Sequence, residues 1–279
     1  MTHERPAIGA LLREWRQRRR LSQLDLACEA EISTRHLSFV ESGRARPSRE
    51  MVLRLAERLD VPLRERNALL AAAGFAPVFA ERPMTDPALQ PARQAIELLL
   101  AAHEPYPALA VDRHWTLVTA NRAVAPLLAG IDRALLEPPV NVLRLSLHPR
   151  GLAPRIVNAA EWRAHVLDRL RRQVALTADR ALVALLNEVR ALPAGEAPDD
   201  RSAHPSRDLG GVVIPLQLRH GGGVLSLLST TTVFGTPVDI TLSELAIESF
   251  FPADDATAAA LRAASGGGGS GAGRTPDTA

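Results

Sequence analysis

A short run of polar side chains after Ser33 has the chemistry needed to read the edges of DNA bases. Its members are Thr34, Arg35, His36 and Ser38. If the segment is helical, Leu37 and Val40 form its inner face, and these polar residues then face outward on the first turns. Side chains of this length donate to and accept from base edges when a helix lies in the major groove. The pattern indicates a recognition helix that begins after Ser33.

A second short helix is predicted immediately before it. Ser22 is a suitable N-cap, because its hydroxyl can accept from a backbone N–H in the first turn that follows Gln23. Leu26, Ala27 and Ala30 stand at helical spacing, and a small residue at position 27 lets another helix cross closely. Two capped helices joined by a short turn form a helix-turn-helix.

Arginines flank this pair of helices on both sides. Five precede it and three follow it around Pro47: Arg13, Arg16, Arg18, Arg19, Arg20, Arg44, Arg46 and Arg49. Two capped helices with arginines also occur in ordinary helical bundles, but a local excess of positive charge is what phosphate neutralisation needs. The residues predicted to contact DNA are Arg18, Ser22, Gln23, Ser33, Thr34, Arg35, His36, Ser38, Arg44 and Arg46. We expect Thr34, Arg35 and His36 at bases, and Arg18, Arg44 and Arg46 at phosphates.

The stretch from Leu12 to Phe75 contains "LSQLDLA", "ISTRHLSFVESGRARPS" and "LLAAAGFAP". It resembles the Cro/C1-type (XRE) helix-turn-helix family of bacterial transcription regulators. The resemblance implies binding to double-stranded operator DNA as a homodimer. Family members usually have glycine in the turn where this chain has Glu31, and a left-handed conformation there costs a non-glycine residue about 1 kcal/mol.

Composition bounds the rest of the molecule. The chain has 279 residues, 46% of them hydrophobic, which is enough for two modest domains with real cores. No apolar run approaches the roughly 18 residues that a membrane span needs, and the N-terminus is polar, so a cytoplasmic protein without a membrane partner is expected. The single cysteine, Cys28, excludes an internal disulfide; we expect a buried thiol, with a redox switch as the alternative.

The pattern of breaks and periodicities predicts four regions. Residues 1–80 form the helix-turn-helix domain, with five helices over residues 7–74. Residues 81–104 are a linker and connecting helix: Pro77, Pro83, Pro87 and Pro91 punctuate residues 76–91, and a helix follows over 92–102. Residues 105–264 form a second domain, and the Gly/Ser-rich residues 265–279 are a disordered tail.

The second domain mixes strands and helices. Strands are predicted at 108–111 and 116–120 as a hairpin, then at 212–220, 224–234 and 240–251, with Pro215 indicating an edge strand or a bulge. Helices are predicted at 121–128, 159–175 and 179–191, and a Pro/Gly/Asp-rich loop at 193–208. This order predicts an α+β fold, with helices on one face of an antiparallel sheet.

Two strings in this region, "EPYPALAVDRHWTLVTANRAV" and "PPVNVLRLSLHPRGLAPRIVNAAEWRAHVLDRLRRQ", resemble the MmyB-like ligand-binding domain over residues 92–251. The resemblance implies a PAS-like sensor domain behind a Cro/C1-type motif, holding a small apolar effector of the fatty-acyl kind. The predicted fold is thus α+β multidomain: an all-α five-helix helix-turn-helix domain, then a PAS-like antiparallel sheet with helices on one face.

A pocket is expected between the sheet and the segment 143–162. The residues predicted to bind the ligand are Trp115, Leu145, His148, Arg155, Asn158 and Trp162. Further apolar walls are expected from Leu117, Leu147, Leu225, Leu227 and Phe250, with Arg150 as another polar group. Arg155 or His148 would meet a ligand carboxylate. The same residues also suit an ordinary core with surface arginines.

Catalytic chemistry has little support. The chain has no HExxH, no CxxC and no glycine-rich phosphate loop, and neither Ser146 nor Ser226 has a Gly-x-Ser-x-Gly setting. We therefore predict no catalytic residues, no metal site and no cofactor, and a ligand-responsive transcription regulator rather than an enzyme. Two alternatives remain: a second domain that only dimerises or recruits a protein partner, and a PAS sensor that holds haem or flavin.

Overall fold

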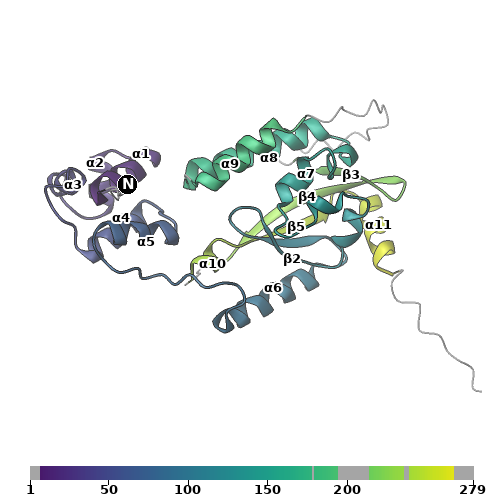
Figure 1. Ribbon diagram of the computed structural model, residues 1–279, viewed down its shortest axis with the longest axis horizontal. Coiled ribbons are helices and arrows are strands. Elements are labelled where there is room, and N and C mark those ends of the chain that lie inside the picture. Colours follow the sequence, from purple (N-terminus) through teal and green to yellow (C-terminus); the bar gives the residue numbers. More distant parts are fainter. Residues whose placement is uncertain (1–6, 178, 194–213, 236–238, 267–279) are drawn as a thin grey trace, which may run out of the picture. The chain divides into compact units, whose positions relative to one another are not determined.

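The computed structural model describes residues 7–177, 179–193, 214–235 and 239–266. They form two compact units (Figure 1). The described part of the first unit comprises residues 7–86, 175–177, 235 and 239–243, and the second unit holds the remaining residues. Within the described residues, no helix has the length and apolar character needed to span a membrane.

Five helices make up the body of the first unit, as predicted: α1 (Ile8–Arg18), α2 (Gln23–Glu29), α3 (Thr34–Glu41), α4 (Arg49–Arg58) and α5 (Leu63–Ala72). The predicted inner faces are confirmed, since Leu26, Ala27, Ala30, Leu37 and Val40 are all buried in one apolar core. Cys28, however, is exposed, so the prediction of a buried thiol was wrong. It lies on α2 beyond the stripe that the core covers.

Side-chain caps start three of these helices. The hydroxyls of Ser22, Ser33 and Ser48 accept from the backbone N–H three residues later, and Ser22 forms a full capping box with Asp25. The turn between α2 and α3 passes through Glu31 at φ 56°, the left-handed conformation predicted for this position. The Cro/C1-like turn is kept without its usual glycine.

The second unit is built on a five-stranded sheet in the order β2-β1-β5-β4-β3, with every neighbouring pair antiparallel. Its strands are β1 (Ala108–Val111), β2 (Leu117–Ala120), β3 (Leu216–His220), β4 (Gly223–Val233) and β5 (Ala246–Pro252). Glu248 on β5 lies opposite Leu109 on β1 and Thr231 on β4. Because strand side chains alternate between faces, these three residues share one face of the sheet.

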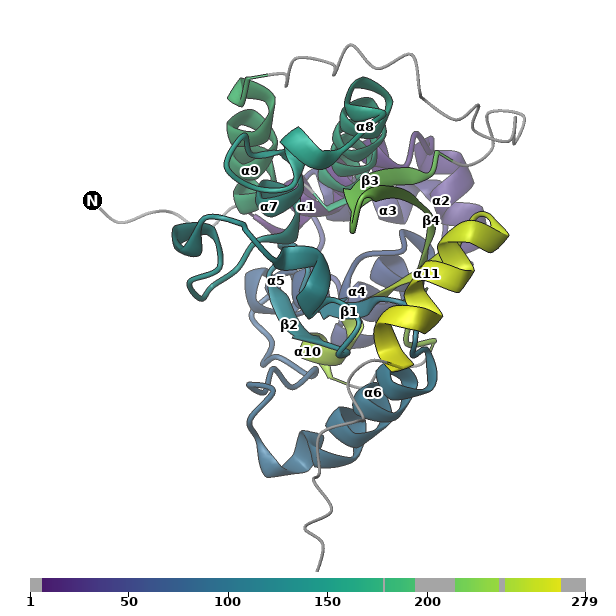
Figure 2. The same cartoon turned by 90° about the vertical axis from the view of Figure 1, so that its right-hand side faces the viewer.

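Helices of the second unit cover this sheet. They are α6 (Gln90–Ala102), α7 (Val142–Leu147), α8 (Ala159–Thr177), α9 (Arg180–Ala191) and α11 (Asp255–Gly266), together with 3₁₀ turns at Pro87–Leu89, Ala125–Leu128, Arg133–Leu135 and Ala153–Arg155. In Figure 2, α8 and α9 lie side by side on one side of the sheet and α6 lies on the other. Arg163, near the start of α8, donates to the carbonyl of Arg190, near the end of α9, so these two helices are antiparallel.

The predicted α+β class is confirmed. The helix predicted at 92–102 is α6, and the structure adds α7 and α11 to the predicted helices. Pro215 immediately precedes β3, which is an edge strand as expected. Residues 240–251 are not one strand: α10 (Ile240–Ser243) precedes β5, because the Asp239 carboxylate caps the N–H of Thr241 at 2.9 Å. Residues 121–128 form turns and a 3₁₀ segment with Pro126 in its first turn, instead of an α-helix.

Two predictions fall mainly where the structure is not described. The loop predicted at 193–208 and the start of the strand at 212–220 lie outside the described residues from 194 to 213. The predicted tail from 267 to 279 also lies outside them, while residues 265 and 266 end α11.

Candidate functional site: an exposed helix and an apolar cavity

The N-terminal turns of α3 carry the residues predicted to read bases. Arg35 is exposed, and Thr34, His36 and Ser38 are partly exposed, while Leu37 and Val40 point into the core. The guanidinium carbons of Arg35 and Arg44 lie 5.4 and 5.9 Å from the ring centroid of Phe39. Phe39 therefore supports two cations beside the exposed face of α3. Arg46 is exposed in the following loop.

Other predicted DNA contacts already hold local structure. Gln23 donates to the Glu41 carboxylate at 2.8 Å, and Arg18 pairs with Glu14 and lies over the ring of Trp15. The hydroxyls of Ser22 and Ser33 accept from backbone N–H groups as caps. These side chains thus fix the ends of α1, α2 and α3.

Glu41 is the buried carboxylate that joins these helices. It accepts from Nε and Nη2 of Arg16 at 2.7 and 2.9 Å in a bidentate pair between α3 and α1. Burial alone would raise the pKa of Glu41, but the hydrogen bonds from Arg16 and Gln23 and the charges of Arg16 and Arg13 outweigh it, so the pKa lies below its usual value. The carboxylate is therefore ionised at neutral pH and locks α3 against α1.

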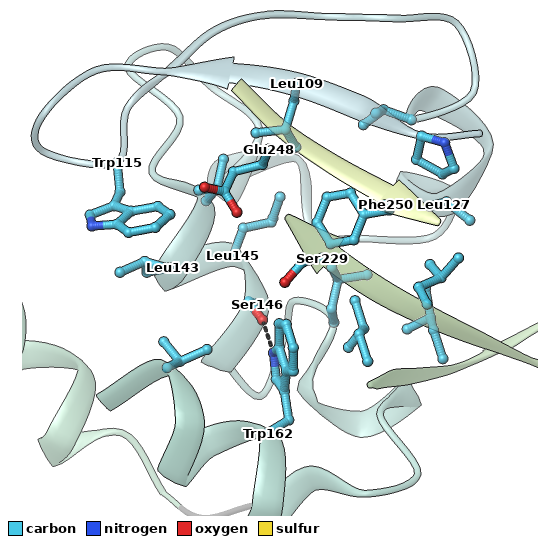
Figure 3. Close-up of a pocket in the computed structure, with 18 of the residues that line it drawn as sticks. Leu109, Trp115, Leu127, Leu143, Leu145, Ser146, Trp162, Ser229, Glu248 and Phe250 are labelled. Carbon is cyan, nitrogen blue, oxygen red and sulfur yellow. Dashed lines mark hydrogen bonds between the residues drawn. The ribbon is translucent and has the colours of Figure 1, made fainter. Parts of the chain in front are cut away.

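The second unit contains a partly open cavity between α7, α8 and the face of the sheet that carries Glu248 (Figure 3). The space open to the centre of a water molecule is about 110 Å³, well above the roughly 10–15 Å³ that one water needs. Its walls are mostly apolar and include Pro107, Leu109, Trp115, Leu117, Val124, Leu127, Leu128, Val142, Leu143, Leu145, Leu152, Trp162, Val166, Leu216, Leu218, Leu227 and Phe250. Such walls suit a hydrocarbon ligand.

A few polar groups also line the cavity: Ser146, His165, Arg169, Ser229 and Glu248. Arg169 on α8 makes a bidentate pair with Glu248 on β5, from Nη1 to Oε2 at 2.9 Å and from Nη2 to Oε1 at 2.6 Å. The guanidinium also lies over Trp115, 4.5 Å from its ring centroid. The hydroxyl of Thr231 donates to Oε1 of the same carboxylate at 2.9 Å.

Neighbouring interactions hold two tryptophans of the lining in place. Trp162 donates from Nε1 to the Ser146 hydroxyl at 2.8 Å, which fixes α8 against α7 (Figure 3). Trp115 donates from Nε1 to Gln173 at 2.7 Å and has a left-handed backbone, with φ of 66°. These contacts set the two rings at different points on the cavity wall.

Three of the six predicted ligand residues line the cavity. Trp115, Leu145 and Trp162 line the cavity, whereas His148, Arg155 and Asn158 are not among its described lining residues. Arg155 donates to the backbone carbonyls of Leu127, Ala129 and Arg219.

Asn158 joins β3 through Pro215 and Gln217, and Nδ1 of His148 accepts from the N–H of Arg150. Among the additional predicted walls, Leu117, Leu227 and Phe250 line the cavity, while Leu147 and Leu225 belong to the core around it. Arg150 pairs with Asp132 at 2.5 Å.

Four lining residues were not predicted from the sequence: His165, Arg169, Ser229 and Glu248. A usable signal existed: a lone acidic residue inside the otherwise apolar strand "AIESFF", and a cation on the helix predicted at 159–175. A charge placed inside an apolar strand demands a partner when that strand is buried.

The described residues contain no group of three or more His, Cys, Asp or Glu side chains positioned to hold a metal ion. Comparison with protein families matches residues 92–264 to the MmyB-like transcription regulator ligand binding domain and residues 7–69 to a helix-turn-helix domain. The first of these matches is to a domain of transcription regulators. A search of curated proteins gave no significant match.

The first match covers well over half of the chain, including every residue that lines the cavity. The second covers α1–α4 and most of α5, including the three capped helices and the exposed face of α3. The chain belongs to the family of MmyB-like transcription regulators, and it carries a helix-turn-helix domain ahead of the ligand-binding domain that defines that family.

Proposed function

We propose that this protein binds a specific operator as a homodimer through α3, and that its second unit binds a small apolar effector with a fatty-acyl type of chain. The observation that carries the proposal is the mostly apolar cavity inside the matched ligand-binding domain. The exposed N-terminal turns of α3 supply the DNA-reading surface. Binding to operator DNA requires the protein to act in the cytoplasm.

The operator should have two half-sites. Two-fold symmetric dimers of helix-turn-helix proteins bind pseudo-palindromes whose half-sites lie about one turn, ~10 bp, apart. Selection of full-length protein on random DNA gives the operator, and sedimentation of the full chain tests the dimer. A monomer that binds a single asymmetric half-site would contradict this part of the proposal.

Two arginine variants separate base reading from phosphate contact. Arg35→Ala should relax preference at one base position and cost about 1–3 kcal/mol of binding. Arg44→Ala should weaken binding to all sequences alike and reduce the salt slope by about 1. Arg171 is an exposed arginine on α8, so Arg171→Ala is the charge-matched control. It should change neither the base preference nor the salt slope. If Arg35→Ala leaves base preference unchanged, α3 is not placed on DNA as proposed.

The effector is tested by mass spectrometry of an organic extract of the purified protein. We expect a molecule with a hydrocarbon chain that shifts operator affinity by about five- to 150-fold, the usual range of allosteric coupling. Operator DNA must then change ligand affinity by the same factor. An extract without lipid, together with no binding of added lipids, would favour a second unit that only dimerises or recruits a protein. A coloured protein would favour haem or flavin.

A further inference from the structure

Among the described residues that line the cavity, Arg169 is the one permanent cation, and its charge is already balanced. Both terminal nitrogens of Arg169 donate to Glu248, and Nη2 also donates to Thr231. The flat face of the guanidinium is covered by Trp115. Among the described lining residues, a ligand carboxylate would therefore find no guanidinium that lacks an anionic partner.

Glu248 makes the same wall unfavourable for an anion. Its side chain is only 5% exposed, and its carboxylate projects from β5 into the space bounded by Trp115, Leu145 and Phe250 (Figure 3). Like charges a few ångströms apart in a poorly solvated site disfavour each other's ionised forms. Oε2 accepts a single hydrogen bond, from Arg169, among the described residues, and can accept another.

Besides Ser146, whose hydroxyl accepts from Trp162, two neutral groups belong to the described polar lining. Ser229 lies diagonal to Glu248 on the same face of the sheet, and its hydroxyl makes no hydrogen bond with any described residue. His165 stands one helical turn before Arg169 and contacts Trp162, with ring centroids 5.5 Å apart. Burial and the charge of Arg169 lower the pKa of His165, so its imidazole is neutral at pH 7 and offers one donor and one acceptor.

We propose that the effector's polar end is an uncharged group that carries a hydrogen-bond donor, such as a hydroxyl or an amide, and that it binds at Glu248, Ser229 and His165. A free fatty acid is disfavoured at this position, because the lining is neutral overall and rich in acceptors. The inference rests on the proposed function, in which the cavity holds an apolar chain, and it names the chemical class of the head group.

The test uses ligands that share a chain and differ in their head group. Full-length protein, freed of bound lipid, is titrated at pH 7.5 with decanol, decanamide and decanoate. We expect the two neutral ligands to bind at least about tenfold more tightly than decanoate. Decanoate binding as tightly as the neutral ligands, or more tightly, would overturn the inference while supporting the apolar cavity. Failure of all three to bind would overturn the proposed function with it.

A variant reverses the expected selectivity. Glu248→Gln keeps the size of the side chain but leaves the charge of Arg169 unbalanced, so decanoate should gain about tenfold or more while decanol changes little. Glu188→Gln is the matched control, because Glu188 also makes a bidentate pair, with Arg144 at the surface; the change should alter the affinity for neither ligand. Unchanged decanoate affinity in folded Glu248→Gln would contradict the assignment. If that variant does not fold, the ligand series on the unaltered protein still decides.

Discussion

At the scale of single residues, each unit buries a carboxylate and pairs it with an arginine from another element. Glu41 pairs with Arg16 in the first unit, and Glu248 pairs with Arg169 in the second. Removing one member of such a pair leaves an uncompensated buried charge, which is more costly than the intact pair is stabilising. The first pair therefore favours the packing of α1 on α3, and the second favours the packing of α8 on β5.

Replacing Arg16 should destabilise the first unit strongly. Arg16→Ala leaves the fully buried Glu41 side chain with fewer donors, so we expect a loss of about 3 kcal/mol in the free energy of unfolding. Urea denaturation followed by circular dichroism measures it. Arg18→Ala, which breaks the more exposed pair with Glu14, should cost less than about 1 kcal/mol. Equal losses in both variants would show that burial of Glu41 does not matter.

The same carboxylate predicts a pH dependence. The pKa of Glu41 is lowered from 4.5 on folding, so its ionised form stabilises the folded unit above that pH. That contribution is lost as the pH falls below 4.5 and through the lowered value. Glu41→Gln should be less stable at pH 7 and should lose less stability on acidification. Urea midpoints of both proteins at pH 7 and below pH 4.5 test this. The same decrease in midpoint for the variant and the unaltered protein would refute it.

At the scale of elements, α1 and α3 cross at Gly9. A Cβ atom at this position would lie 2.4 Å from the carbonyl oxygen of Val40 and 2.7 Å from that of Glu41. Both are backbone atoms of α3 and cannot rotate away. The crossing therefore requires glycine, although glycine is a poor helix former.

Gly9→Ala should consequently destabilise the first unit, whereas the same change ordinarily stabilises a helix. We expect a loss of about 1–3 kcal/mol, because α1 and α3 must separate. Ala10→Gly at the exposed neighbour is the control and should cost about 1 kcal/mol through helix propensity alone. Thermal unfolding of both variants measures the difference. Stabilisation by Gly9→Ala would show that the crossing is looser than the structure has it.

At the scale of the whole molecule, the chain passes between the units more than once. The strands β4 and β5 supply Ser229 and Glu248 to the cavity, yet the described residues between residue 234 and Glu244, which are 235 and 239–243, belong to the first unit. Within that unit, Asp239 is buried and accepts from Arg82 at 3.0 Å, and the N–H of Ile240 donates to Ala80 at 2.9 Å. Two cavity strands are thus joined through the chain to the DNA-binding unit.

This path predicts a variant that uncouples ligand from operator. Arg82→Ala removes the partner of buried Asp239 and should loosen the segment around α10. The factor by which the ligand changes operator affinity should then fall to less than about a third of its native value, while the affinity for the ligand itself stays unchanged. Titration of operator with and without ligand tests this. Arg54 is an exposed arginine on α4, and Arg54→Ala should keep the native change of operator affinity with ligand. A full response in Arg82→Ala would rule out this route of coupling.

The sequence by itself determined what depends on neighbouring residues. Ser22 and Ser33 cap helices because a hydroxyl and an N–H three residues away meet in any helix start. Pro215 precedes an edge strand because proline cannot donate to a sheet. The left-handed conformation of Glu31 was expected from the resemblance, because this position of the turn is usually a glycine.

Only the tertiary structure decided what depends on distant partners. The segment 240–243 has the apolar character of a strand, but the cap at Asp239 and its contacts with Ala80 and Arg82 make it helical. Arg155 looked available to a ligand, yet carbonyls brought near by folding occupy it. Arg169 and Glu248 are 79 residues apart, and only the packing of α8 on β5 joins them. Local hydrogen bonds are fixed by spacing along the chain, whereas the partner of a buried charge is fixed by which elements pack together.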